Sequence, residues 1–164
     1  TSNATLAWNA VSGATGYELS VDGTTWTDIG NVTTIDAKTA LGLGDGSYTI
    51  RVRAKNAAGS GSAASLSFNL DTVAPANVNW SGVVPSRQGT QYLSLVLANV
   101  ANDIATLISL TDSTGGTIQN ARIVSGQIVF DWTTPNAGTG TIVAVYRDAA
   151  GNERTCTINV TLTP

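Results

Sequence analysis

Residues 47–55 read SYTIRVRAK, and this stretch decides the fold class of the chain. Apolar and polar side chains alternate along it, and the apolar ones are Tyr48, Ile50, Val52 and Ala54. A period of two residues is typical of a β-strand with one face buried and the other in solvent. The pattern therefore predicts a half-buried strand whose apolar face contributes to a core.

Similar short alternating segments occur on both sides of this strand. They are separated by turn residues, among them Asp22-Gly23, a strong hairpin signal, and nowhere does a helical period appear. Many short strands with regular turns predict an all-β fold of sandwich type. The other strands are expected at residues 5–8, 17–21, 25–29, 32–36, 64–70, 92–97, 105–110, 118–124, 127–132, 141–147 and 154–162.

The stretch DTVAP at residues 71–75 divides the chain into two β-rich halves. We expect two tandem β-sandwiches, over residues 1–70 and 77–164, joined by a linker at 71–76 that Pro75 stiffens because its φ is fixed. The turns KNAAG and RDAAG repeat between the halves, with Asn56 and Asp148 lying 92 positions apart (148 − 56). Repetition on the scale of a domain is expected of a tandem array.

Composition narrows the function classes. The 164 residues carry a net charge of −3 and are only 12% charged, so the basic field that attracts nucleic acid is absent. No apolar run is long enough for a membrane helix, and we expect no membrane insertion. There is no His and only one Cys, Cys156, which we interpret as a buried apolar residue. The usual zinc sites and His-dependent triads are therefore excluded, and since the acidic residues fall mostly in turns, we expect no enzyme.

Two family resemblances appear at this point. Trp8, Tyr17 and residues 45–56 resemble a fibronectin type III domain, which implies a core position for Trp8 and a tyrosine corner in which the Tyr48 hydroxyl bonds nearby backbone. The second half, through residues 71–75 and 148–152, resembles the bacterial immunoglobulin-like repeats of large surface proteins, and here we expect no tyrosine corner, because Thr141 or Ile142 stands near that position.

The first domain departs from its family at the start. Few residues precede the strand of Trp8, so the first strand of the family fold is missing or very short. We interpret the chain as an excerpt of a longer protein and hypothesise that a segment from elsewhere completes this domain. The hypothesis predicts a hydrophobic groove beside the Trp8 strand.

A calcium site at the linker is the first candidate for chemistry. In an immunoglobulin-like sandwich, the loop between the second and third strands and the loop between the last two strands lie at the end where the chain enters. In the second half these two loops carry Asp103 and Asp148, and Asp71 enters at the same end. Together with carbonyls and waters, these three carboxylates would supply the oxygens that Ca²⁺ requires, and Asp22 or Asp45 of the first domain would be further candidates. The alternative is that they are turn residues, since Asp bonds its own local backbone.

Two further groups could bind a glycan or a host surface protein. The outward stripe of Arg51, Arg53 and Lys55 suits an acidic partner, although pairing with Glu18 on a neighbouring strand is the simpler interpretation. Trp26, Trp80 and Trp132 would stack on sugars if exposed, or pack at a sandwich edge if not.

These observations favour a structural role. We expect the stalk of an extracellular bacterial adhesin, with neighbouring domains of the same chain as partners, holding a binding module away from the cell. The alternatives are a glycan- or protein-binding module, or an accessory domain of a secreted polysaccharide-degrading enzyme.

Overall fold

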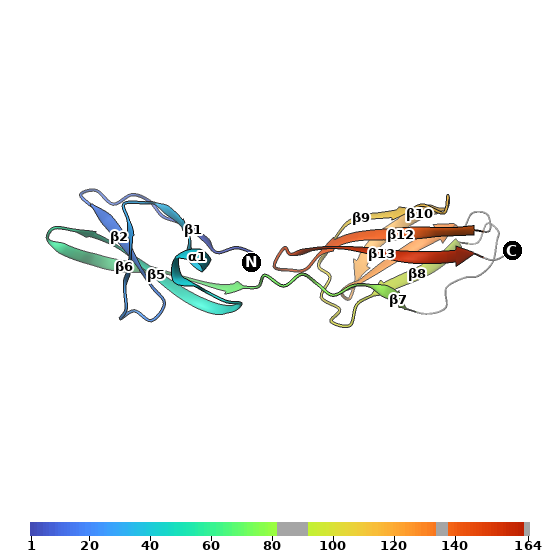
Figure 1. The fold of residues 1–164 in the computed structure, drawn as a ribbon, viewed down its shortest axis with the longest axis horizontal. Coiled ribbons are helices and arrows are strands. Elements are labelled where there is room, and N and C mark those ends of the chain that lie inside the picture. The colour runs from blue at the N-terminus through green and yellow to red at the C-terminus, as the bar shows by residue number, and fades with distance from the viewer. Residues whose placement is uncertain (82–91, 134–137, 163–164) are drawn as a thin grey trace. The chain divides into compact units, whose positions relative to one another are not determined.

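The computed structural model describes residues 1–81, 92–133 and 138–162, and divides the chain into two compact units, Thr1–Thr72 and Val73–Pro164. Both units consist of antiparallel β-sheets, so the chain is an all-β protein of immunoglobulin-like sandwiches, as the alternation predicted (Figure 1). The helix α1 (Ala37–Leu41) is a single turn, and the described residues contain no apolar helix able to cross a bilayer. The sequence also predicts a turn at residues 85–89 and a loop at 133–140, and this turn and part of this loop lie outside the described residues.

The first unit contains two sheets. One pairs β1 with β4, and the other has the order β3-β2-β5-β6. The hairpin signal Asp22-Gly23 connects β2 to β3, as predicted. The strands are β1 (Thr5–Ala7), β2 (Gly16–Ser20), β3 (Thr27–Gly30), β4 (Thr34–Asp36), β5 (Gly46–Asn56) and β6 (Gly59–Leu70).

Side chains from both sheets meet in the core of this unit. Leu6 of β1 packs with Leu19, Ile50 and Leu70 of the larger sheet, and Trp8 lies partly buried against them, with its ring centroid 5.5 Å from that of Tyr17. The Tyr48 hydroxyl donates to the Gly44 carbonyl at 3.0 Å, which confirms the tyrosine corner.

Two features of the first unit differ from the sequence prediction. The helix α1 was not expected; Asp36 caps it by accepting from the Lys38 amide, and Gly42 ends it in the left-handed conformation at φ 65°. The alternation of Tyr17, Leu19 and Val21 also predicts that Val21 faces inward, but it is 45% exposed because β2 ends at Ser20 and the chain there turns into the hairpin.

The second unit has seven strands among its described residues. One sheet has the order β10-β11-β8-β7 and the other β13-β12-β9. The strands are β7 (Asn79–Ser81), β8 (Tyr92–Ala98), β9 (Thr106–Asp112), β10 (Thr117–Val124), β11 (Gln127–Thr133), β12 (Gly138–Arg147) and β13 (Glu153–Leu162).

Alternate residues of β11 and β12 dominate the core of the second unit. Phe130, Trp132, Ile142 and Tyr146 are all fully buried, and Cys156 on β13 is buried with them, as its alternation indicated. The Trp80 ring of β7 stacks near Trp132, with 6.3 Å between centroids.

The two units share a common plan. Strands β1, β2, β4, β5 and β6 have the same order and pairings as β8, β9, β11, β12 and β13, as the strand order in each sheet shows. The repeated turns, Asn56 to Gly59 and Asp148 to Gly151, therefore connect equivalent strands, β5 to β6 and β12 to β13. Strand β7 has no counterpart in the first unit, all of which the structure describes.

Candidate functional sites

Hydrogen bonds within the first unit hold the residue at its carboxyl end. The carboxylate of Asp45, in the loop before β5, accepts from the Thr72 amide at 3.1 Å and from the Thr72 hydroxyl at 2.8 Å. One residue earlier, the Asp71 amide donates to the Thr1 carbonyl at 3.0 Å. The chain is thus fixed to the first unit up to Thr72.

A second set of hydrogen bonds holds the start of the second unit. Arg154 on β13 donates through Nε to the Pro75 carbonyl at 2.7 Å, and Pro75 is fully buried. The Tyr146 hydroxyl donates to the Ala76 carbonyl at 2.7 Å and accepts from the Val78 amide at 3.0 Å. Between the two anchored positions, Thr72 and Pro75, the chain has only two residues.

The Tyr146 hydroxyl is one of the few polar groups in the core of the second unit. Burial raises the pKa of Tyr146 to about 12, and the nearby Cys156 makes a smaller contribution in the same direction. The phenol is thus neutral at physiological pH and can donate and accept at once. Sequence reasoning missed this residue as an anchor, although its inward position two residues after Ala144 was a usable signal for a buried hydroxyl that requires partners.

The residues predicted to bind calcium have local hydrogen-bond partners. Asp148 Oδ1 accepts from the amides of Gly151 and Asn152 at 2.8 and 2.9 Å, and Asp103 accepts from the Asn99 side-chain amide. These are the turn contacts of the alternative interpretation, and both carboxylates lie in the second unit, whereas Asp71 lies in the first. Within either unit, the described residues include no group of three His, Cys, Asp or Glu side chains arranged to hold a metal ion.

The other two carboxylates considered for calcium are also engaged. Asp22 Oδ1 accepts from the amides of Thr24 and Thr25 at 2.7 Å each, and these bonds hold its pKa far below the usual range. Asp45 is bonded to Thr72 as described above.

Two of the three cations predicted on the outward face of β5, Arg53 and Lys55, are paired across strands, as the simpler interpretation predicted, whereas Arg51 lies opposite Ser20. Arg53 lies directly opposite Glu18 and donates to it at 2.7 Å, while Lys55 contacts Asp28 on β3. The hydrogen bond from Arg53 lowers the pKa of Glu18, and that from Lys55 lowers the pKa of Asp28. These cations are therefore already neutralised by neighbours within the sheet.

The three tryptophans considered for stacking on sugars already make contacts within the protein. Trp132 is fully buried and donates to Asp112 at 2.9 Å, so it cannot stack on a glycan. Trp80 packs against the same core. Trp26 is half-buried, and the guanidinium of Arg53 lies 3.8 Å from its ring centroid, in a cation–π contact.

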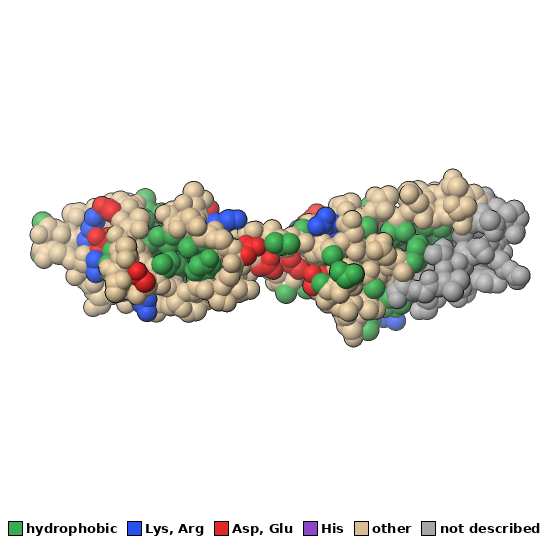
Figure 2. Space-filling model, turned by 60° about the horizontal axis from the view of Figure 1, so that its bottom comes forward, with side chains coloured by type: hydrophobic (Ala, Val, Ile, Leu, Met, Phe, Trp, Pro, Cys, Tyr) green, Lys and Arg blue, Asp and Glu red, His purple; other side chains and the backbone are tan. Residues whose placement is uncertain are grey.

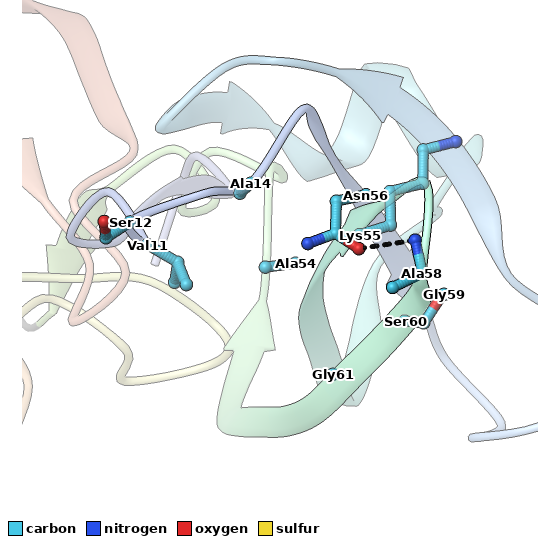
Figure 3. Close-up of a pocket in the computed structure, with 10 residues that line it drawn as sticks. All are labelled: Val11, Ser12, Ala14, Ala54, Lys55, Asn56, Ala58, Gly59, Ser60 and Gly61. Atoms are coloured by element: carbon cyan, nitrogen blue, oxygen red, sulfur yellow. Dashed lines mark hydrogen bonds between the residues drawn. The ribbon is translucent and has the colours of Figure 1, made fainter.

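A shallow pocket lies between the loop around Val11 and the β5–β6 turn (Figure 3). Its walls include Ser12, Asn56 and Ser60, and the Ala58 amide donates to Asn56 Oδ1 within the turn. The single charged residue in its lining, Lys55, already contacts Asp28. The pocket therefore presents no unpaired charge to a ligand.

An apolar groove lies beside the strand of Trp8. It is lined by Leu6, Ala7, Trp8, Ile50, Val52, Ala64, Ser65 and Leu66, which come from β1, β5, β6 and the residue after β1. The sequence predicted a hydrophobic groove at this position, and its presence confirms that expectation.

Comparisons with known proteins include distant similarities to solved structures. No family model matches the chain, and no curated protein matches it. The structure of the selenomethionine-substituted chicken interferon gamma receptor alpha chain is 10% identical, with 98% of this chain and 92% of that one covered and a TM-score of 0.35.

A second similarity involves a glycan-complexed protein. The SGBP-B protein of the Bacteroides ovatus mixed-linkage glucan utilization locus, solved with a mixed-linkage heptasaccharide, is 19% identical, with 98% of this chain covered and a TM-score of 0.30. The present chain spans 40% of the length of that protein. Similarity of fold at this distance does not identify a function.

Proposed function

We propose that this chain is a structural segment of an extracellular bacterial adhesin, in which serial sandwich units form a stalk. The observation that carries the proposal is the anchoring of the linker on both sides. Asp45 holds Thr72, and Arg154 and Tyr146 hold Pro75 and Ala76, so that two residues, Val73 and Ala74, connect the anchored positions. A short connection with fixed ends limits the motion of one unit relative to the next, which is what a stalk requires.

The state of the groups considered for binding a glycan supports the same role. Arg53 and Lys55 of β5 are paired, Trp132 is buried and the pocket near Val11 carries no unpaired charge. The proposed role is mechanical and involves no catalysis. Its partners are the neighbouring domains of the same protein.

The test measures how far the two units tumble together. We expect ¹⁵N relaxation to give similar rotational correlation times for both units of the natural chain, longer than expected for either alone. A variant with six Gly/Ser residues inserted between Val73 and Ala74 serves as the uncoupled reference. In the double variant Asp45→Ala, Arg154→Ala, the correlation times of the two units should approach those of the insertion variant, because the hydrogen bonds of Asp45 to Thr72 and of Arg154 to Pro75 are lost.

Two outcomes would count against the stalk. One is a natural chain whose units tumble as independently as those of the insertion variant. The other is saturable binding on a glycan array, which would favour the binding-module alternative over a spacer.

A further inference from the structure

The first unit is one strand short of the second. In the second unit β7 pairs antiparallel with β8, and the equivalent of β8 in the first unit is β1. In the first unit, which the structure describes completely, β1 pairs only with β4 and no strand occupies its other edge. That edge has no strand partner within this unit, a state that sheets usually avoid.

The apolar groove runs beside this unpaired edge. Leu66 on its β6 wall is 56% exposed, although its alternation with Phe68 and Leu70 places it on the inward face. Figure 2 shows hydrophobic side chains gathered at the surface of the first unit. The inward face of β6 is therefore only partly covered by the residues of this unit.

The second wall of the groove is also an open edge. Strand β6 ends the order β3-β2-β5-β6, and its twelve residues, GSGSAASLSFNL, include neither a charged residue nor a proline. Exposed edges are normally protected by charges, proline or bulges against pairing with other strands. The pairing of β5 with β6 shifts register between Ser60 and Ala63, which places a bulge in that part of β6. From Ala63 to Leu70 the edge has no charge, proline or bulge, and this part is suited to pairing with a further strand.

Thr1 already shows the direction that such a strand takes. Its amino group donates to the Asn69 carbonyl at 2.8 Å, and its carbonyl accepts from the Asp71 amide at 3.0 Å. Bonds to the residues on either side of Leu70 form a parallel bridge. A residue joined to the amino group of Thr1 would continue along β6 toward Phe68 and Leu66, over the groove.

We propose that the groove between β1 and β6 is a strand-acceptor site that takes an extended polypeptide segment joined ahead of Thr1. The segment runs parallel to β6 and places apolar side chains at alternate positions against Leu6, Trp8 and Leu66. It is uncharged on that face, because the lining offers no charged partner. A segment covalently joined to Thr1 is favoured over a separate peptide, because the covalent link raises the effective concentration of the segment at the groove. The hydrogen bonds of Thr1 to Asn69 and Asp71 also fix how the segment aligns with β6.

The experiment compares the 164-residue chain with a form carrying the segment VTVTVTV ahead of Thr1. Because backbone groups alternate between the two edges of a strand, the amides of Ser65 and Ser67 share the open edge with those of Asn69 and Asp71. We expect hydrogen exchange at Ser65 and Ser67 to slow by about tenfold or more in the extended form. The melting temperature of the first unit should rise, while that of the second should not change.

Two controls make the result specific. A GSGSGSG extension has the same length without apolar side chains and should give neither effect. In the VTVTVTV form, Leu66→Lys should abolish the gain in protection, whereas Val100→Lys, at a position 95% exposed in the second unit, should leave it intact.

Three outcomes would overturn the proposal. The first is unchanged exchange at Ser65 and Ser67 in the VTVTVTV form. The second is equal protection from an unlinked VTVTVTV peptide at equimolar concentration, which would make the site a receptor for separate peptides. The third is protection in the unextended chain that increases with its own concentration, which would make the occupant a second copy.

Discussion

The hydroxyl of Tyr146 donates a 2.7 Å hydrogen bond to the carbonyl of Ala76, 70 positions earlier in the chain. The same hydroxyl accepts from the Val78 amide, so one side chain of β12 fixes the backbone that leads into β7. The first unit uses a tyrosine in a different way, since Tyr48 bonds the Gly44 carbonyl only 4 residues away. Tyr48 closes a local turn, whereas Tyr146 joins the start of its unit to the core.

Replacing Tyr146 by Phe should destabilise the second unit by about 2 kcal/mol, because the buried Val78 amide loses its acceptor and the Ala76 carbonyl its donor. Differential scanning calorimetry should show the loss in the second unit alone. Tyr48→Phe is the matched control, and its cost should be smaller and confined to the first unit, since that hydroxyl lies in an exposed contact. Equal costs for the two variants would argue against the anchoring role of Tyr146.

Alkaline pH should selectively weaken the second unit. Burial raises the pKa of Tyr146 to about 12, above the value of about 10 in an unfolded chain. A raised pKa contributes stability that is fully present below pH 10 and is lost as pH rises toward 12. A melting series across this range should show the decline in the natural chain, and Tyr146→Phe should reduce its slope. Parallel declines in both proteins would assign the effect to other groups.

Acid should weaken the first unit through its cross-strand pairs. The pKa values of Glu18 and Asp28 are both lowered by their hydrogen bonds to Arg53 and Lys55. Lowered values contribute stability that is present above about pH 4 and lost as pH falls through the folded-state pKa. The melting temperature of the first unit should therefore fall below about pH 4, and Glu18→Gln should flatten this fall and lower the melting temperature at pH 7. An acid limb that Glu18→Gln leaves unchanged would contradict this assignment.

Gly116 should tolerate no side chain. A methyl group at this position would lie 2.5 Å from both Trp132 Nε1 and Asp112 Oδ2, which hydrogen-bond each other at 2.9 Å. Gly116→Ala should cost about 1–3 kcal/mol in the second unit by breaking that partly buried hydrogen bond. Gly44→Ala is the control, because nothing lies within 4 Å of its added methyl. Denaturant unfolding followed by tryptophan fluorescence would measure both, and a near-neutral Gly116→Ala would show that the Trp132 indole can move aside.

Local periodicity was sufficient to predict the sandwich strands other than β7, whose three residues are too few to show an alternation. The alternation along residues 47–55 predicted strand β5, and the tyrosine corner at Tyr48 followed from the family resemblance. The pairing of Glu18 with Arg53 was also predictable, since both residues lie on outward faces of neighbouring strands. Each of these features depends on residues that are close in sequence or adjacent in the same sheet.

The remaining features depend on distant partners that periodicity does not encode. Arg154 reaches the Pro75 carbonyl, 79 positions away, and nothing in the pattern around either residue indicates the other. Leu66 has the alternation of a core residue yet is 56% exposed, because burial requires a covering strand as well as an inward direction. The one-turn helix α1 is too short to produce a helical period and depends on its caps at Asp36 and Gly42.

Chelation tests the sequence-based prediction that Asp71, Asp103 and Asp148 bind Ca²⁺ at the linker. A site with a Kd of about 10⁻⁴ M in about 1 mM calcium would add about 1.4 kcal/mol, so EDTA should lower the melting temperature and calcium should restore it. Asp71→Asn should abolish this difference, whereas Asp131→Asn, a carboxylate on β11 that accepts from Asn120, should preserve it. Identical melting with and without EDTA would leave Asp148 with the role its hydrogen bonds already define, closing the turn between β12 and β13.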